Sequence, residues 1–517
     1  MWYIWVCRFP CQYRALLIIM QSSSIKAGAI ISYISVFLSI AITFFYTPWM
    51  IRQIGVSDYG LYSLAITFIA YFVMDFGMSG TVTRFIAKYR AEGNEKKVGN
   101  LLGLIFKVYF AIDVVIFLVL LVVGFFLSGI FQGLTPEEIE KLKVLFAIAA
   151  LFSVLTFVFK PMHGAMMAYE YFVETKLIDM AQKVGTVLLI VIALLIGMGV
   201  YALVLINGAV ALFTSLLLYV VFRRKSKLKI NFDYFDKPEM KALLDFSVWV
   251  FLITMAQRFR LTFMPSLLGM LADSTQISIF SLGMSIEGMV WVLSSALNGL
   301  FLPKVSRLSH QGDAKAITEL MIRVGRIQFY IISLIFFGFV ILGQDFLHLW
   351  VGDKFHNTYF VVLLLIGTNL VSLTQHVASD LVYAENKVRY TATLTFVASG
   401  IALLGSIFLA PILGAVGCAL SFFVAMSVNI IQLNIFYKRK LQVDVGRFFR
   451  CCHFRLMPVM CMVAALFYVA KQFIPIGSWL LLVSFGAIYA ISALALDYLV
   501  LFNKEEKSNL LSLIHRK

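Results

Sequence analysis

Apolar segments of roughly membrane-crossing length alternate with short gaps along almost the whole chain, and most lysines and arginines lie in every second gap. The hydrocarbon core of a bilayer is about 30 Å thick, and about 20 apolar helical residues are needed to cross it. With 61% hydrophobic and 14% charged residues, we expect an all-α integral membrane protein and not a soluble multidomain chain. The pattern predicts fourteen membrane-spanning helices, at residues 27–48, 59–80, 100–127, 142–161, 176–198, 200–222, 244–269, 276–302, 325–345, 359–383, 391–410, 412–437, 456–474 and 477–502.

The basic residues predict how these helices are oriented. Dense basic clusters follow even-numbered spans, at 84–97, 223–229 and 438–440. The opposite gaps and their edges hold only a few basic residues, namely Arg52, Lys141, Lys143, Lys354 and Lys471. Because positive charge is retained on the cytoplasmic side of a membrane, both termini are expected in the cytoplasm.

Composition also excludes several classes of function. The net charge of +16 is accounted for by the loop bias, so we expect contact with membrane lipids and no nucleic-acid partner. The six cysteines show no C-x-x-C spacing and the seven histidines are scattered, so neither a structural zinc site nor disulfides are expected. No G-x-x-x-x-G-K-[ST] motif occurs, and we predict no ATP hydrolysis by a P-loop, no metal and no cofactor.

The two halves of the chain repeat short motifs at a constant offset of about 215–219 residues. Residues 57–64 (SDYGLYSL) match 274–282 (STQISIFSL), and Gly93-Asn94 matches Gly312-Asp313. An offset that contains six spans places both copies in the same orientation, so spans 1–6 and 7–12 are predicted to form two parallel lobes. Spans 13 and 14 have no counterpart.

The repeat predicts the domain organisation. We expect a cytoplasmic N-terminal segment at 1–26, an N-lobe at 27–222, a cytoplasmic linker at 223–243, a C-lobe at 244–437, and the last two spans with a cytoplasmic tail at 438–517. Residues 1–19 are apolar but interrupted by Arg8, Pro10 and Arg14. They fit either an over-extended start, with Met20 as the natural one, or an interfacial arm.

Arg258 and Arg260 lie in the middle of the predicted seventh span, where a charge is costly unless it faces water or a partner. At 100° per residue, Arg258 shares a polar stripe with Thr254 and Thr262, whereas Arg260 lies closer to Gln257. Guanidinium groups bind phosphate oxygens in a bidentate manner, so the pair is a candidate clamp for an anionic substrate. The alternatives are a structural ion pair, for example with Glu287 or Asp75, and snorkelling.

Other polar residues lie inside the predicted spans. Hydroxyl side chains at Ser32, Ser35, Ser39, Thr43 and Thr47 form a stripe on span one, which either lines a cavity or mediates helix packing. Asp75, Asp113 and Glu287 are candidates for binding a coupling cation or proton, or for neutralising the arginines. Lys107 is expected to snorkel toward the membrane surface.

Three segments resemble the signature of a known family. They are residues 50–64 (MIRQIGVSDYGLYSL), 75–77 (DFG) and 84–89 (RFIAKY). The chain resembles the bacterial polysaccharide transporters, the O-antigen and capsule flippases of the multidrug/oligosaccharidyl-lipid/polysaccharide exporter superfamily. The similarity extends from about residue 24 to span twelve and is weaker in the last two spans.

This resemblance implies a two-lobe fold shared with the multidrug exporters of the superfamily, no enzymatic activity, and transport by alternating access in the bacterial plasma membrane. The implied substrate is an undecaprenyl-diphosphate-linked oligosaccharide, and the implied partners are the polymerase and glycosyltransferase machinery. A monomer is expected. Lipid II flipping and multidrug/cation antiport are the alternatives within the superfamily, and a membrane-embedded polymerase or ligase is the alternative outside it.

Overall fold

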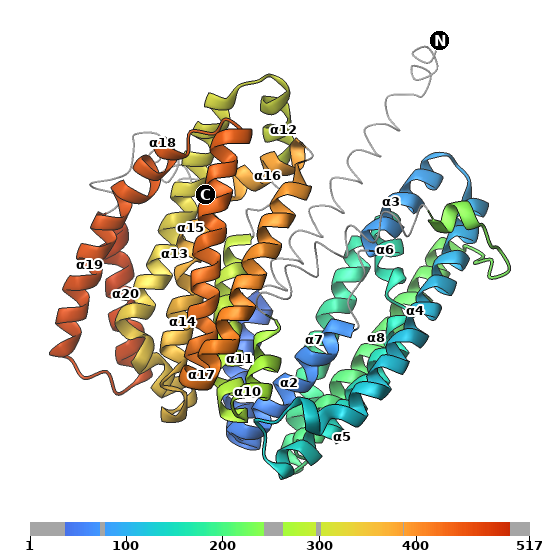
Figure 1. Cartoon of the computed structure of the whole chain (residues 1–517), viewed down its shortest axis with the longest axis horizontal. Helices are drawn as coiled ribbons and strands as arrows, with labels where there is room; N and C mark the ends of the chain where they lie inside the picture. The colour runs from blue at the N-terminus through green and yellow to red at the C-terminus, as the bar shows by residue number, and fades with distance from the viewer. Residues whose placement is uncertain (1–36, 73–77, 242–261, 296–300, 386, 497–517) are drawn as a thin grey trace, which may run out of the picture. The chain divides into compact units, whose positions relative to one another are not determined.

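The computed structural model describes residues 37–72, 78–241, 262–295, 301–385 and 387–496. The chain divides into two compact units, Met1–Met255 and Ala256–Lys517. Every regular element in the described ranges is helical, which confirms the predicted all-α class (Figure 1). The boundaries of the five predicted domains stay a prediction.

The first unit is built from long, apolar helices. Residues 37–54 are helical and are followed by α2 (Val56–Phe72), α3 (Met78–Ala91), α4 (Glu95–Ile130), α5 (Pro136–Phe157), α6 (Pro161–Ala168), α7 (Phe172–Leu195) and α8 (Val200–Ser226). Helix α5 packs against α2, α4 and α8, and α8 packs against α7. Helix α5 begins at Pro136, within a capping box. The Thr135 and Glu138 side chains each accept a hydrogen bond from the other residue's backbone amide.

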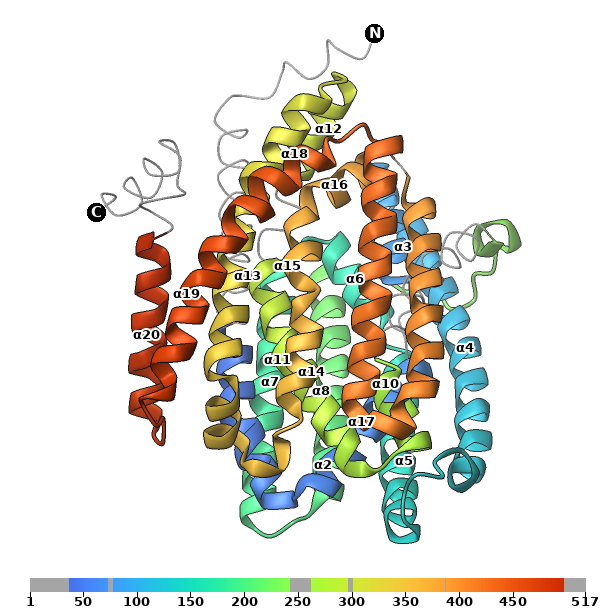
Figure 2. The same ribbon diagram turned by 60° about the vertical axis from the view of Figure 1, so that its left-hand side comes forward.

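The second unit contains more helices and more breaks. Its elements are α10 (Met264–Leu271), α11 (Ser274–Ser295), α12 (Leu302–His310), α13 (Ala314–Val351), η1 (Asp353–Phe355), α14 (Thr358–Gly367), α15 (Asn369–Ser372), η2 (Leu373–Gln375), α16 (His376–Ala384), α17 (Val388–Lys440), α18 (Val445–Phe449), the π-helix η3 (Arg450–Phe454), α19 (Arg455–Gln472) and α20 (Trp479–Leu496). Helices α19 and α20, which the sequence predicts as an appendage, pack on α13 (Figure 2).

Nine helices in the described ranges are long and apolar enough to cross a membrane. One of them, α17, is a hairpin of two helices, because Pro411 lies inside it and Gly414 has φ +57°. This turn falls where the sequence separates spans eleven and twelve. The total of fourteen spans stays a prediction, since spans one, two, seven, eight and fourteen include residues outside the described ranges.

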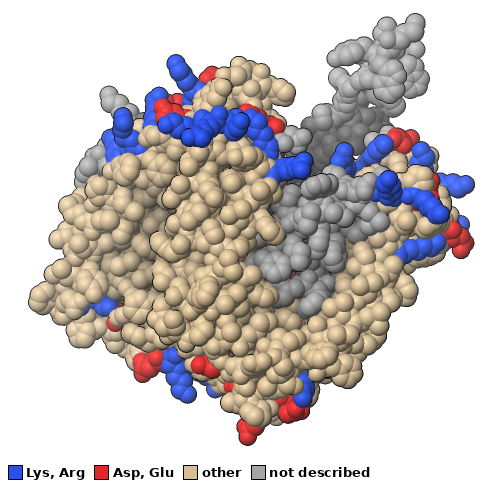
Figure 3. Space-filling model, in the orientation of Figure 1, with Lys and Arg blue, Asp and Glu red and all other residues tan. Residues whose placement is uncertain are grey.

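The surface of the helices matches a hydrocarbon environment. Large apolar side chains are exposed along α4, for example Phe125 at 82% and Phe126 at 64%. On the face shown in Figure 3, Lys and Arg gather near the helix ends of each unit, and the middle of each unit is almost free of charge. Exposed apolar surface of this extent is explained by contact with lipid.

The two motifs that the sequence pairs at a constant offset have the same local structure. Gly93 and Gly312 adopt positive φ angles of 70° and 68°, a conformation that favours glycine. The next residues, Asn94 and Asp313, cap α4 and α13 by accepting hydrogen bonds from the backbone amides of Lys97 and Ala316. Helices α4 and α13 therefore begin in the same way.

In the first unit, the segment after α8 returns to the beginning of α4. The Asn231 amide donates to the Gly99 carbonyl over 3.1 Å, and the Phe232 ring lies 5.8 Å from that of Phe106. A Cβ atom on Gly103 would lie 1.8 Å from the carbonyl oxygen of Asn231. This close approach is possible only because residue 103 is a glycine. We name residues 228–236 the N-strap.

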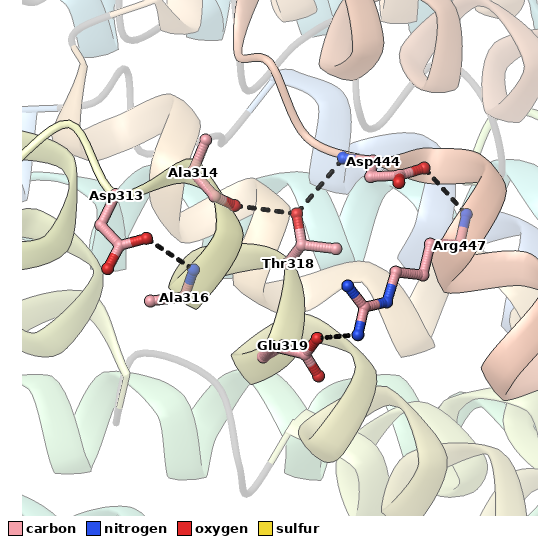
Figure 4. Close-up of polar contacts among 7 residues, drawn as sticks. All are labelled: Asp313, Ala314, Ala316, Thr318, Glu319, Asp444 and Arg447. Atoms are coloured by element: carbon pink, nitrogen blue, oxygen red, sulfur yellow. Dashed lines mark hydrogen bonds and ion pairs between the residues drawn. The ribbon is translucent and has the colours of Figure 1, made fainter.

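The second unit contains a similar return, shown in Figure 4. After α17, the Asp444 amide donates to the Thr318 hydroxyl of α13 over 3.2 Å. The Asp444 carboxylate caps α18 by accepting from the Arg447 amide, and the Arg447 guanidinium forms an ion pair with Glu319. In the first unit, then, the segment after α8 is held against the first turns of α4. In the second unit, the segment after α17 is held against the first turns of α13.

Candidate functional site

The described part of the first unit contains a lysine in the middle of a membrane-spanning helix. Lys183 is the twelfth of the 24 residues of α7, which places its Cα about 17 Å from the helix beginning. Its ammonium group donates to the Ser39 hydroxyl of helix 37–54 over 2.8 Å. Lys176 and Lys225 nearby are paired with Asp179 and Glu174. By contrast, no described carboxylate forms an ion pair with Lys183.

An ammonium group at this depth is expensive in hydrocarbon. The Ser39 hydroxyl satisfies one of its three donors, and the Lys183 side chain is exposed. Two donors therefore remain for water or for an anionic group. This arrangement is typical of a charge that faces a wet transport path.

Three residues of the predicted hydroxyl stripe, Ser39, Thr43 and Thr47, lie in helix 37–54 and differ in their contacts. Thr43 donates back to the Ser39 carbonyl over 2.9 Å, a local bond that satisfies it without any ligand. Thr47 is buried. Ser39 alone among these three contacts a charged side chain in the described ranges. Ser32 and Ser35 lie outside them.

Most of the predicted anion clamp also lies outside the described residues. This holds for Arg258, Arg260, Thr254 and Gln257, and for Asp75 among the ion-coupling candidates. Thr262 is described: it is half-buried and lies in the turn before α10. The roles assigned to all of these residues stay predictions.

Asp113 is a buried carboxyl group in the middle of α4. Its side chain is 5% exposed, and its Oδ1 atom has no hydrogen-bond partner among the described residues. Lys107, six residues earlier, points away from it and donates to the Tyr234 carbonyl of the N-strap over 3.3 Å. The structure therefore does not bring Lys107 and Asp113 together, and the role of Asp113 in ion coupling stays a prediction.

Glu287, in α11, contacts a break in the predicted tenth span. It accepts a hydrogen bond of 2.9 Å from the Asn369 amide group, and Asn369 is the first residue of α15, directly after the end of α14. From there to Gln375 the chain forms a short α-helical turn and a 3-10 turn before α16 begins. Broken membrane helices supply backbone carbonyl groups to coupling ions in transporters. The hydrogen bond with Asn369 thus places the Glu287 carboxylate beside a broken helix.

Lys183 and Arg326 are among the charged residues within the predicted spans that the sequence pattern did not single out. Lys183 lies inside the predicted fifth span (176–198), but Lys176 and Asp179 precede it there, so it does not stand out as an isolated charge in an apolar run. Arg326 lies at the edge of predicted span nine and is 3% exposed, with its guanidinium donating to the Tyr330 hydroxyl over 3.3 Å. Measuring the depth of each basic residue from its helix end would have found Lys183.

Comparison with solved structures identifies the class of fold. The chain is similar to the lipid II flippase MurJ in an inward closed conformation (TM-score 0.66, 12% identity, 93% of this chain and 99% of that one). It is also similar to an inward-facing multidrug-resistance MATE family transporter of the MOP superfamily (0.59, 12%, 77% and 96%). A third similar structure is the Vibrio cholerae MATE transporter VcmN (0.55, 15%, 81% and 98%). The chain therefore has the fold of membrane transporters of this superfamily.

The family follows from the sequence itself. Residues 49–359 match the family of polysaccharide biosynthesis proteins. The match covers more than half of the chain, which belongs to this family. No curated protein matches it. The multi-pass membrane character and the transporter fold that the sequence predicted are confirmed, and the family resemblance is confirmed with them.

Proposed function

We propose that this protein flips an undecaprenyl-diphosphate-linked oligosaccharide from the cytoplasmic to the outer leaflet of a bacterial plasma membrane, for O-antigen, capsule or exopolysaccharide assembly. Family membership and the transporter fold support a lipid-linked substrate. The observation that carries the proposal is Lys183, a cation half-way along the membrane-spanning helix α7 that is held by a serine and, among the described residues, by no carboxylate. Such a group suits the diphosphate of a substrate that crosses the membrane.

In the proposed mechanism, the charged head of the substrate crosses through a wet path while its lipid tail remains in the bilayer. The ammonium of Lys183 in the first unit would attract a diphosphate group, and the clamp predicted at Arg258 and Arg260 would bind phosphate oxygens. Alternating access exposes this path to one side at a time. Energy would come from an ion gradient or from consumption of the product outside, and the protein would act as a monomer with both termini in the cytoplasm. The predicted polymerase and glycosyltransferase partners would use the flipped product.

The function is tested by complementation. The gene, expressed in a derivative of its native host that lacks it, is expected to restore surface polysaccharide to the wild-type amount. Failure of the wild-type protein to do so would contradict the proposal. Lipid II flipping predicts, instead, rescue of a strain depleted of its lipid II flippase.

The Arg258→Ala variant is expected to lower export about tenfold or more, because a charge-assisted hydrogen bond contributes about 1.5–3 kcal/mol. The measurement is the amount of surface polysaccharide per cell at matched expression. Lys143→Ala is the control, since the Lys143 ammonium pairs with Glu140 over 2.7 Å in an exposed position and exposed pairs contribute little. Full export by the Arg258 variant would contradict the proposed role of Arg258 in binding the diphosphate.

The carboxylate of Glu287 is proposed to couple transport to a cation or a proton. Replacing it with glutamine keeps a hydrogen-bond acceptor for Asn369 but removes the charge. Glu287→Gln is expected to abolish the stimulation of transport by an ion gradient in proteoliposomes while leaving downhill flipping measurable. Glu319→Gln, at an exposed ion pair with Arg447, serves as the matched control. Unchanged stimulation in the Glu287 variant would assign coupling elsewhere.

Multidrug/cation antiport is the remaining candidate, and Asp113 and Glu287 are the observations that favour it. An antiporter of cationic drugs uses intramembrane carboxylates and gains nothing from a lysine at mid-depth. Measuring ethidium efflux in the same cells separates the two. Efflux that depends on Glu287 and not on Lys183 would favour the antiporter.

A further inference from the structure

The second unit carries a long apolar groove that the transport proposal does not use. It has a volume of about 540 Å³ and lies among α14, α15, the second half of α17, and α18. Its lining is Gly367, Thr368, Val371, Phe423, Ser427, Ile430, Ile431, Asn434, Ile435, Lys438, Val445 and Phe449. The volume is within the range of about 300–1,000 Å³ that is typical of small-ligand sites.

The groove runs along one face of α17. From Phe423 to Lys438 its lining recurs every three or four residues, the spacing of one helix face. These fifteen steps correspond to about 22 Å along the helix axis. One leaflet, including its headgroup region, is about 20–22 Å thick. The groove therefore spans one leaflet, from near the midplane to the membrane surface.

The groove walls present almost no free polar group. The Ser427 hydroxyl donates to the Phe423 carbonyl over 2.8 Å, and the Thr368 hydroxyl donates to the Leu365 carbonyl over 3.0 Å. The Asn434 side chain accepts from Gln375 and donates to the Ile430 carbonyl, each over 2.8 Å. Ile431 and Ile435 are 59% and 48% exposed. The walls thus suit a hydrocarbon chain.

The end of the groove at the membrane surface is different, because Lys438 lies there. Two other basic residues of this region are already paired, Lys387 with Glu385 over 2.6 Å and Arg447 with Glu319. Lys438 is exposed and forms no ion pair with a carboxylate in the described ranges. Its ammonium group is therefore available at the level of lipid headgroups, on the side that the positive-inside rule makes cytoplasmic.

From this geometry we propose that the groove is a binding site for an anionic phospholipid of the cytoplasmic leaflet. One acyl chain lies along α17, and the phosphate is bound by Lys438. Any surface that faces the bilayer meets lipid, so the content of the proposal is selectivity for a negatively charged headgroup at one place. The proposal concerns a resident membrane lipid and does not depend on the identity of the transported molecule.

Native mass spectrometry of the full-length protein in detergent tests this site. The protein is incubated with equal amounts of dioleoyl phosphatidylglycerol and dioleoyl phosphatidylethanolamine, and the retained lipids are counted. A lysine near the surface contributes about 1 kcal/mol toward an anionic lipid, so we expect the wild type to retain the first bound phosphatidylglycerol about fivefold better. Equal retention of the two lipids by the wild-type protein would overturn the proposal.

Variants locate the site. Lys438→Gln is expected to remove the preference, whereas Lys440→Gln, the same change two residues along the helix and outside the groove lining, should keep it. Ser427→Phe should fill the groove and lower retention of both lipids, and Val424→Phe, on an exposed position outside the lining, should not. A preference unchanged in Lys438→Gln would overturn the proposal, even if Ser427→Phe fails to fold. Displacement of phosphatidylglycerol by an equal amount of undecaprenyl phosphate would overturn it too, because the groove would then hold a polyprenyl chain.

Discussion

The Lys183→Gln variant is expected to lower flipping of a lipid-diphosphate substrate about 10- to 100-fold. A hydrogen bond from a charged donor contributes about 1.5–3 kcal/mol, which corresponds to this range of rate or affinity. Glutamine can still donate to Ser39 but cannot supply positive charge to a phosphate group. The measurement is the initial rate of flipping in proteoliposomes at equal protein content.

Three further variants make the result specific to Lys183. Lys183→Arg keeps the charge and is expected to retain most of the activity. Lys176→Gln removes a charge from the same helix at a position paired with Asp179 over 3.8 Å, and should transport normally. Ser39→Ala removes the hydroxyl that holds the ammonium, and should have a smaller effect than loss of the charge. If Lys183→Gln flips at the wild-type rate, the lysine is structural and the proposed path does not pass it.

Introducing valine at Gly103 is expected to release the N-strap from α4. The new Cβ atom would lie 1.8 Å from the Asn231 carbonyl oxygen and 3.2 Å from the Phe232 amide nitrogen. Both are backbone atoms, so the strap must move as a whole and lose its bonds to Gly99 and to Lys107. Overpacking of this kind costs about 1–3 kcal/mol, to which the lost hydrogen bonds add about 0.5–1.5 kcal/mol each.

Trypsin reports this change directly. The N-strap and its flanks contain Lys227, Lys229 and Lys241 as trypsin sites, and cleavage between residues 227 and 241 is expected to accelerate in Gly103→Val together with a lower Tm. Gly129→Val is the matched control, because it lies on the same helix with no atom within 4 Å of its Cβ position. Cleavage at the wild-type rate in Gly103→Val would show that the strap does not depend on its contact with α4.

The sequence predicted the fold class correctly because membrane spans are a local property. An apolar run of about 20 residues must form a helix in a bilayer, wherever its neighbours lie. The repeat was visible for a similar reason: the caps at Asn94 and Asp313 are formed within one turn of chain. Helix breaks were harder to predict. Pro161 marks the beginning of α6, whereas no proline marks the break between Gly367 and His376.

The candidate site could be predicted only in part. Sequence reasoning identified Glu287 and Asp113 as carboxyl groups within the predicted spans, but it named no contact for Lys107 and overlooked Lys183. Distances along the chain explain this result. The partner of Lys183 is 144 residues away, that of Lys107 is 127 residues away, and that of Glu287 is 82 residues away.

The sequence alone thus determined that the chain is an all-helical membrane protein with a parallel repeat, and its signature segments pointed to the family. Hydrophobic spans and helix caps each depend on residues within a few turns of one another, so a short stretch of sequence is enough to predict them. Only the tertiary structure decided which intramembrane charges are paired and which are available. The partners of a charged group within a span lie on other helices, and packing brings them together from distant parts of the chain. Ser39 beside Lys183, and Asn369 beside Glu287, are contacts of that kind.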